Sequence, residues 1–540
     1  MTRESFAQRL KASMAAQGLK QIDIIRAAKD RGEKIGKSHI SQYVSGKTIP
    51  RAATMNLLAD ILQVDALWLA GEQAETASAM PSPEKEIPKE EGALKENRKG
   101  NQERNQELAQ KPEQTQESRL EKKAHENTME EHTMREFKKS TKLNDVLYDV
   151  RGPVVDEAAR MERSGMHILK LNIGNPAPFG FRTPDEVVYD MSRQLTQCEG
   201  YSDSKGLYSA RKAIMQYAQT KNIPNVTIED VYTGNGVSEL INLSMSALLD
   251  NGDEVLVPSP DYPLWTACVT LAGGKPVHYI CDEQSEWFPD FADMEKKITE
   301  HTKAIVLINP NNPTGALYPT DVLQNIVDIA RKHQLMIFSD EIYDRLVMDD
   351  HEHISIASLA PDLFCVTFSG LSKSHMIAGY RVGWMILSGN KRLGEDYIQG
   401  INMLSNMRLC SNVPAQSIVQ TALSGYQSPQ DYVVPGGRIF EQRECVIDAL
   451  KEIPGISVVK PKATFYAFPK IDVKKFNIKD DEQFALDFLK EKKVLLVHGR
   501  GFNWKDPDHF RVVFLPRVEV LKKAMNELSD FLDHYQQISR

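Results

Sequence analysis

A single lysine stands among small polar residues in the stretch "FSGLSKSHMIAGYRVGW", which covers residues 368–384. Lys373 precedes Arg381 by eight positions, and glycines stand on both sides of the pair. A lysine condenses with a carbonyl group once its amine has lost its proton, and burial and nearby positive charge favour that loss. The stretch alone does not separate this chemistry from an ordinary solvated lysine.

Further polar residues follow short apolar runs of the chain. The runs "DEVLVPSP", "KAIVLINP", "LMIFSDE" and "LFCVTFSG" alternate with helical patterns, which predicts parallel strands joined by crossover helices. Asn312 follows the second run, Asp340 ends the third with Tyr343 three residues later, and Lys373 follows the fourth. Because the carboxyl ends of parallel strands meet at one edge of a sheet, we expect these side chains to lie together.

A glycine turn before a helix adds an anion site. In "VYTGNGVSELINL" the free N–H groups and the dipole of a helix N-terminus would hold a phosphate. Pyridoxal phosphate requires an amine, a phosphate site, an acid beside the pyridine nitrogen, donors at the phenolate oxygen and a stacking ring. The polar residues therefore favour pyridoxal 5'-phosphate as cofactor.

A series of motifs in one order extends this interpretation over about 400 residues. The motifs are "YDVRGPV", "LKLNIGNPAPFGF", "GNGVSELI", "VPSPDYPLWTA", "INPNNPTGA", "DEIYD", "GLSK", "MRLCSNVPAQ" and "PDHFRVVFLPR". With them, residues 137–540 resemble a fold-type I aminotransferase of the aspartate aminotransferase superfamily, and more narrowly the bacterial glutamate–pyruvate (alanine) aminotransferases. The resemblance implies an α/β homodimer with a large, mainly parallel-sheet domain (about 185–430) and a smaller α/β domain (about 137–184 and 431–540).

The resemblance also assigns roles at the cofactor. Lys373 would form the Schiff base and move the substrate proton, and Asp340 would pair with the pyridine nitrogen. Tyr343 and Asn312 would donate to the phenolate oxygen, and Tyr262 would stack on the ring. The phosphate would be held by Gly236, Val237, Ser238, Ser372, Arg381 and, from the partner subunit, Tyr201.

On the substrate side the resemblance gives Arg511 the α-carboxylate, with help from Asn312 and the Gly174 backbone. Arg408 lies where some members place a residue that reaches the partner's substrate, and a structural salt bridge is an equal alternative. The sequence departs from the family at "KATFYAFP", where a glycine–alanine pair is more usual, and at "GRGFNWKDPDHF". Both stretches border the substrate.

The implied reaction is a ping-pong transamination. An amino acid, with alanine and glutamate favoured, passes its amine to the cofactor, and a 2-oxo acid such as pyruvate or 2-oxoglutarate takes it back. A β-lyase or decarboxylase on the same cofactor is the minor alternative.

Residues 1–71 are of a different kind. Short amphipathic segments stop at Gly18 and Gly32, and "KSHISQYVSGKTIP" and "DALWLAGE" follow. These features resemble a Cro/cI-type helix-turn-helix domain, in which Ile40 and Val44 would face the core. Base edges and phosphates of double-stranded DNA would be contacted by Gln21, Lys37, Ser38, His39, Gln42 and Lys47. Extra residues in "AAKDRGEKIGKSHI" lengthen the turn before the third helix, and a helical protein-interaction module is the alternative.

Charge and composition separate these two parts. Residues 1–71 hold eleven Lys/Arg against six Asp/Glu, which gives them a net charge of +5. Because the whole chain carries −8, the rest of the chain carries −13. Residues 72–136 contain no aromatic residue and few aliphatic ones, which predicts a disordered linker of ~45 Å r.m.s. span, with a solvated helix as the alternative. The combination leaves a second function open, that of a transcription regulator whose aminotransferase-like body senses an amino acid or the cofactor.

The six cysteines are scattered and show no metal-ligand spacing, so we expect reduced thiols and no metal. No secretion signal and no apolar run of bilayer length is present. These features predict a cytoplasmic protein without a membrane partner.

Overall fold

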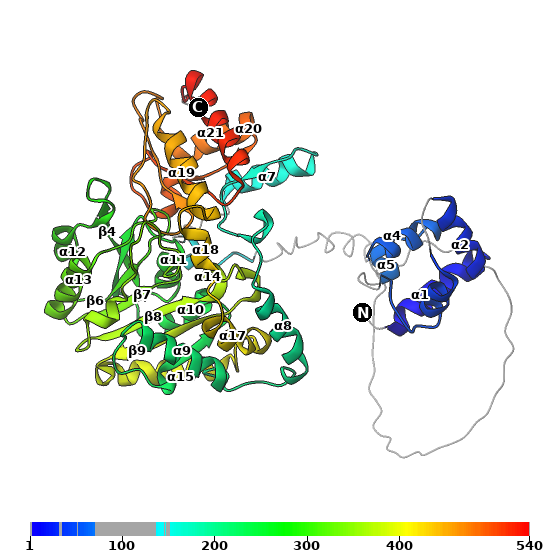
Figure 1. Cartoon of the computed structure of the whole chain (residues 1–540), viewed down its shortest axis with the longest axis horizontal. Helices are drawn as coiled ribbons and strands as arrows, with labels where there is room; N and C mark the ends of the chain where they lie inside the picture. Colours follow the sequence, from blue (N-terminus) through cyan, green and yellow to red (C-terminus); the bar gives the residue numbers. More distant parts are fainter. Residues whose placement is uncertain are drawn as a thin grey trace, which may run out of the picture. The chain divides into compact units, whose positions relative to one another are not determined.

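The computed structural model describes residues 3–31, 35–50, 52–70, 137–144, 146 and 152–538. It divides into two compact units, Met1–Glu130 and Glu131–Arg540 (Figure 1). The predicted linker 72–136 and residues 32–34 of the lengthened turn before the third helix lie outside the described residues, so the linker and the geometry of that turn stay predictions.

Five helices make up the described part of the N-terminal unit. They are α1 (Arg3–Ala16), α2 (Gln21–Asp30), α3 (Lys37–Val44), α4 (Ala52–Ile61) and α5 (Ala66–Ala70). A turn with Gly18 at φ +65° ends α1, and the Asp23 carboxylate accepts a hydrogen bond from the Lys20 N–H at the start of α2 (2.9 Å). The core of the unit includes Phe6, Leu10, Ile24 and Leu58.

Helix α3 has one buried and one exposed side. Ile40 is fully buried and Val44 partly buried, as the helical pattern predicts. Lys37, Ser38, His39 and Gln42 on α3 and Lys47 beyond it are exposed, whereas Gln21 at the start of α2 is half-buried. The unit therefore presents a polar helix face, and its binding to DNA stays a prediction.

The second unit is built on an eight-stranded sheet of order β2-β9-β8-β7-β6-β3-β4-β5. The strands in that order are β2 (Val231–Gly234), β9 (Gly383–Gly389), β8 (Phe364–Gly370), β7 (Met336–Asp340), β6 (Thr302–Ile308), β3 (Glu254–Ser259), β4 (Lys275–Asp282) and β5 (Phe288–Pro289). The four apolar runs singled out in the sequence all form strands, and their mutual pairings β3–β6–β7–β8 are parallel. Strand β9, however, runs antiparallel to both of its neighbours, and β5 is antiparallel to β4. The sheet is therefore mixed but mainly parallel, as expected, because only β9 and β5 run against the other six strands.

Apolar clusters cover both faces of this sheet, because its central strands are buried on both sides. On one face α10 (Val237–Leu248), α11 (Leu264–Leu271) and α15 (Glu395–Met407) pack on side chains such as Val306, Phe338 and Phe368. On the other face lie α8 (Asp185–Gln194), α9 (Tyr208–Thr220), α12 (Phe291–Lys297), α13 (Thr320–His333) and α17 (Val419–Ser424). This layering holds the strand ends in place (Figure 1).

A second core lies in a smaller domain, which contains α19 (Arg438–Lys451), α20 (Asp481–Lys492) and α21 (Val518–His534). These helices pack with a three-stranded antiparallel sheet of order β11 (Tyr466–Ala467), β15 (Phe510–Val513) and β14 (Val497–His498). The remaining described α-helices and β-strands are α7 (Pro153–Arg163), β1 (Leu169–Lys170), α14 (Leu371–Ser374), α16 (Val413–Ser417), α18 (Pro429–Val433), β10 (Ile456–Ser457), β12 (Lys470–Ile471) and β13 (Val494–Leu495). We call the part around the eight-stranded sheet the sheet domain.

All six cysteines lie within the described residues and are free thiols. Among those residues, no helix has both the length and the apolar character needed to pass through a bilayer.

Candidate active site

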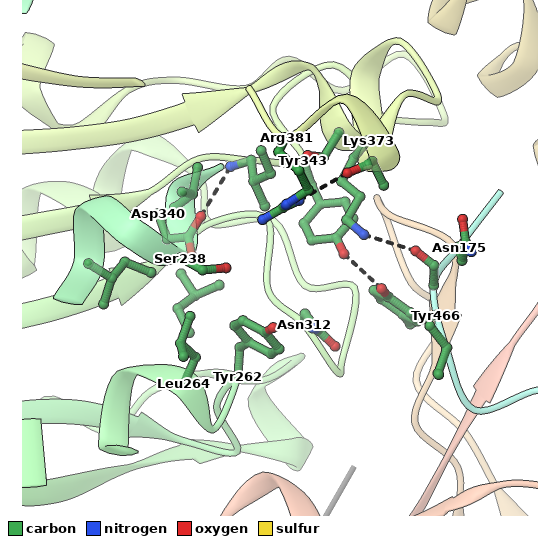
Figure 2. Close-up of a pocket in the computed structure, with 18 of the residues that line it drawn as sticks. Asn175, Ser238, Tyr262, Leu264, Asn312, Asp340, Tyr343, Lys373, Arg381 and Tyr466 are labelled. Carbon is green, nitrogen blue, oxygen red and sulfur yellow. Dashed lines mark hydrogen bonds between the residues drawn. The ribbon is translucent and has the colours of Figure 1, made fainter. Parts of the chain in front are cut away.

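A cavity of about 690 Å³ opens at the carboxyl edge of the large sheet, beside the smaller domain. Asn312 enters it from the loop after β6, Asp340 from the end of β7 and Lys373 from α14, directly after β8 (Figure 2). Arg511 reaches it from β15 of the smaller domain. Eleven of the residues predicted for the site line this cavity: Gly174, Val237, Ser238, Tyr262, Asn312, Asp340, Tyr343, Ser372, Lys373, Arg381 and Arg511.

The Lys373 amine points into the cavity and donates to the Gly174 carbonyl at 2.9 Å (Figure 2). Burial, together with the positive charges of Arg511 and Arg381, lowers the pKa of this amine to about 8 against the opposing negative charge of Asp340. The lysine thus loses its proton far more readily than an exposed one, which is the property that imine chemistry requires.

Asp340 is buried at the end of β7. Its Oδ2 accepts a hydrogen bond from the Trp265 indole N–H (3.1 Å), and its Oδ1 accepts one from the Ile342 N–H (3.3 Å). Burial raises the pKa of the carboxyl group to about 6, and the Trp265 hydrogen bond opposes this shift. The sequence analysis did not identify Trp265, although it lies within the quoted motif "VPSPDYPLWTA".

The Tyr343 hydroxyl lies 2.7 Å from the hydroxyl of Tyr466, a second residue that was not predicted (Figure 2). Burial raises the pKa of both phenols, so each remains protonated and able to donate. Tyr466 falls in "KATFYAFP", which had been singled out only as a departure from the family. Tyr262, half-buried, lines the cavity as well.

An anion site lies at the start of α10. Gly236 has φ +81°, and a Cβ on it would stand 2.2 Å from Arg381 Nη2, so only glycine permits this close approach. Arg381 is held by the carbonyls of Ala378 (3.0 Å) and Asn235 (3.2 Å). The guanidinium, the first N–H groups of α10 and the hydroxyl-bearing Ser238 and Ser372 are therefore gathered at one end of the cavity.

Arg511 is fixed from several sides. Its Nη1 donates to Asn312 Oδ1 at 2.8 Å and its Nη2 to the Asn172 carbonyl. The guanidinium carbon lies 4.4 Å from the centre of the Tyr466 ring and 4.5 Å from that of the Phe502 ring. A planar cation held between two rings is suited to bidentate recognition of a carboxylate.

The remaining predicted residues lie outside the lining of this cavity. Gly236 stands behind Arg381, as described above. Tyr201 is 82% exposed, so its role in a partner's site stays a prediction. Arg408 forms an ion pair with Glu239 and donates to the carbonyls of Thr233 (2.7 Å) and Ser204 (3.0 Å). The chain thus contains the salt bridge that was the alternative for Arg408.

These residues fit pyridoxal phosphate. The glycine-framed anion site and the Lys373 amine lie in one cavity, and the buried carboxylate of Asp340 is present with them. The donor set is that of an organic phosphate cofactor. Over the described residues, no three His, Cys, Asp or Glu side chains are grouped as a metal ion would require.

Comparison with known proteins supports the same assignment. The family "Aminotransferase class I and II" matches residues 166–528. Glutamate-pyruvate aminotransferase AlaA of Haemophilus influenzae is 60% identical over 75% of this chain and 100% of its own length. Alanine aminotransferase of Mycobacterium tuberculosis is 55% identical over 76% of this chain and 96% of its own length.

Two solved structures are similar as well. An aminotransferase from Escherichia coli superposes with a TM-score of 0.74 at 57% identity, covering 75% of this chain and all of that one. Alanine aminotransferase from Pyrococcus furiosus gives a TM-score of 0.70 at 40% identity, covering 73% of this chain and all of that one. The fold, the cavity with its lysine and these relatives agree: the chain belongs to the class I and II aminotransferases and is a pyridoxal phosphate-dependent transaminase of fold type I.

Proposed function

We propose that this transaminase moves an amino group between alanine or glutamate and the matching 2-oxo acids, pyruvate and 2-oxoglutarate. The observation that carries the proposal is the set of Lys373, Asp340 and Arg511 around one cavity. The two relatives at 55–60% identity, a glutamate-pyruvate aminotransferase and an alanine aminotransferase, support the choice of substrates.

When bound, pyridoxal phosphate supplies an aldehyde that condenses with amines and a ring that withdraws electrons from the substrate Cα. Lys373 would accept the proton from the substrate Cα, because its lowered pKa of about 8 leaves part of its amine unprotonated near neutral pH. Asp340 keeps the ring nitrogen protonated through its negative charge. Tyr343 and Asn312, which line the same cavity, would donate hydrogen bonds to the phenolate oxygen, and Tyr262 would stack on the ring.

The two ends of the cavity orient these partners. Gly236, Val237, Ser238, Ser372 and Arg381 hold the phosphate through N–H, hydroxyl and guanidinium donors. At the other end Arg511 binds the substrate α-carboxylate, assisted by Asn312 and the Gly174 backbone. A Cβ at Gly174 would lie 2.0 Å from the Tyr466 hydroxyl, so a larger residue there would displace this wall.

Incubating the purified protein with alanine and 2-oxoglutarate should yield pyruvate and glutamate in equal amounts. Equal yields that require both substrates identify transamination, because a decarboxylase would release CO2 from alanine without 2-oxoglutarate. A β-lyase needs a leaving group on Cβ and would not act on alanine. A panel of other amino donors, each paired with 2-oxoglutarate, ranks the preference. Exchange that proceeds only with donors other than alanine would refute the proposed substrates, and would leave the transaminase assignment in place.

We also propose that the enzyme is a homodimer in which Tyr201 reaches the partner's phosphate site. Large apolar side chains are exposed on and beyond the end of α15, namely Met403, Met407 and Leu409. The loop that carries Tyr201 lies beside them, because Ser204 Oγ donates to Asn406 Oδ1 at 2.6 Å. An exposed apolar surface of this kind marks a contact between protein chains.

As a second function we propose that residues 1–71 bind double-stranded DNA. The polar face of α3, with Lys37, Ser38, His39 and Gln42 exposed over the buried Ile40, is the observation that favours it. Gln21 and Lys47 would contact phosphates. A dimer would present two such units, as palindromic sites require. The alternative is a transcription regulator that binds DNA in the same way and whose aminotransferase-like body senses an amino acid or the cofactor.

Sedimentation of the full chain with a fluorescent duplex tests both proposals at once. The free protein should sediment with twice the mass of one chain, and its DNA affinity should fall steeply as salt rises. Lys47→Gln, at a predicted phosphate contact, should lower the slope of log affinity against log salt by about one. Lys11→Gln, an exposed change on α1, is the matched control and should leave the slope unchanged. A single-chain mass, or no binding at low salt, would overturn the respective proposal.

A further inference from the structure

Two loops that are distant in the sequence meet beside Phe502, whose ring packs against Arg511. One follows β3 in the sheet domain and contains Asp261, and the other follows β14 in the smaller domain and contains Asn503. The Asp261 carboxylate is fully buried. Its Oδ1 accepts a hydrogen bond from Asn503 Nδ2 at 2.7 Å, and its Oδ2 accepts one from the Thr266 hydroxyl at 2.8 Å.

Two backbone-directed hydrogen bonds reinforce this contact. The Asp261 N–H donates to the Phe502 carbonyl at 2.9 Å, and Ser259 Oγ donates to the Asn503 carbonyl at 2.7 Å. The pair Phe502–Asn503 is therefore tied to Ser259 and Asp261 by three hydrogen bonds. Asn503 has φ +56°, a left-handed conformation that asparagine tolerates better than most residues.

Phe502 connects this contact to the substrate site. Its ring is fully buried in the core of the sheet domain, although the adjacent strand β15 belongs to the core of the smaller domain. The same ring lies against the guanidinium of Arg511, with 4.5 Å from the guanidinium carbon to the ring centre. The position of Phe502 therefore sets one side of the slot in which Arg511 lies.

We propose that Asn503 and Asp261 form an interdomain clasp that positions Arg511 for the substrate α-carboxylate, with Asn503 as a positioning residue. The inference rests on the proposed role of Arg511. The clasp fixes the position of Phe502. The rings of Phe502 and Tyr466 in turn fix the orientation of the Arg511 guanidinium. That orientation determines whether Arg511 can bind both oxygens of the substrate carboxylate. Burial raises the pKa of Asp261 to about 7, and the hydrogen bonds from Asn503 and Thr266 oppose this shift and so stabilise its charged form.

Asn503→Gly is the direct test, because glycine keeps the left-handed backbone and removes only the side chain. The KM for alanine and the KM for 2-oxoglutarate should both rise about tenfold, as expected when a hydrogen bond to a charged group is lost. The value of kcat should stay within about twofold, because Arg511 acts on binding in both half-reactions. The amount and the absorption spectrum of bound cofactor should match those of the parent enzyme.

Asn222→Gly is the matched control, since Asn222 is also an asparagine at φ +56° but is exposed and remote from the cavity. It should leave KM unchanged. Asp261→Asn should retain most of the substrate affinity, because an amide oxygen still accepts from Asn503, whereas Asp261→Ala should lose it.

A fall in thermal stability of Asn503→Gly with both KM values unchanged would show a purely structural contact and overturn the proposal. So would a loss of cofactor or of kcat at unchanged KM. If the parent enzyme does not use alanine, the same comparison is made with its best amino donor, so the two proposals fail independently.

Discussion

Replacing Lys373 by alanine should lower the transamination rate by about 10⁴-fold or more, because the proton at the substrate Cα then has no acceptor in place. The structure supports this expectation through the position of the amine, 2.9 Å from the Gly174 carbonyl within the cavity that Asp340 and Arg511 also line. The assay is the alanine and 2-oxoglutarate exchange, measured with cofactor in excess. The variant should still bind the cofactor, since the anion site at Gly236 and Arg381 is untouched, but should release it on dialysis.

Lys303→Ala is the control, because it removes a lysine from the same domain but outside the cavity. Lys303 stands at the start of β6, at the opposite edge, where its amine pairs with Asp253 at 2.7 Å. This variant should remain active.

The pH dependence gives a second readout: since the pKa of Lys373 is lowered to about 8, capture of the cofactor by the cofactor-free parent should speed up as pH rises through 8 and then level off. Activity of the Lys373 variant above a tenth of the parent would contradict the assigned role.

The sequence predicted much of this site because its chemistry lies at strand ends. Asn312, Asp340 and Lys373 each follow an apolar run, and parallel strands bring such positions to one edge of a sheet. The antiparallel direction of β9 was not predictable, since "GWMILSG" is as continuously apolar as the parallel strands. A buried strand has the same composition in either direction.

The contacts that orient the site residues could not be predicted from the sequence. Trp265 donates to Asp340 from α11, and Tyr466 reaches Tyr343 from the smaller domain, across 123 positions of the chain. Each pairing depends on how helices and strands pack, not on local spacing. The same holds for Phe502, whose burial beside Arg511 no periodicity indicates.

The N-terminal unit lies outside the residues that match the aminotransferase family. The relatives named above align over their full length or nearly so, whereas about a quarter of this chain is unmatched in those alignments. Its helices and buried Ile40 follow from amphipathic spacing. The proposed binding to DNA rests on Lys37, His39 and Gln42, whose exposed side chains are equally compatible with a protein partner. The salt dependence of DNA binding therefore decides its function.

Exchanging Arg511 for lysine should lower kcat/KM for alanine about 10²-fold, because lysine keeps the charge but cannot meet both carboxylate oxygens from one plane. Leucine at this position should cost about 10³-fold or more, as expected for the loss of two hydrogen bonds to charged groups. Most of the change should appear in KM, since the carboxylate is bound alike before and during the reaction. Steady-state kinetics with both substrates measures it.

Arg517→Lys is the matched control, being an exposed arginine six residues later in the same motif, and should leave kcat/KM unchanged. The leucine variant carries an additional signature. The positive charge of Arg511 is one of the causes that lower the pKa of Lys373, so its removal should raise that pKa and move the pH profile of cofactor capture toward higher pH. An unshifted profile together with an unchanged KM would show that Arg511 does not act in this cavity, whereas a shifted profile with an unchanged KM would assign it to the electrostatics of Lys373 alone.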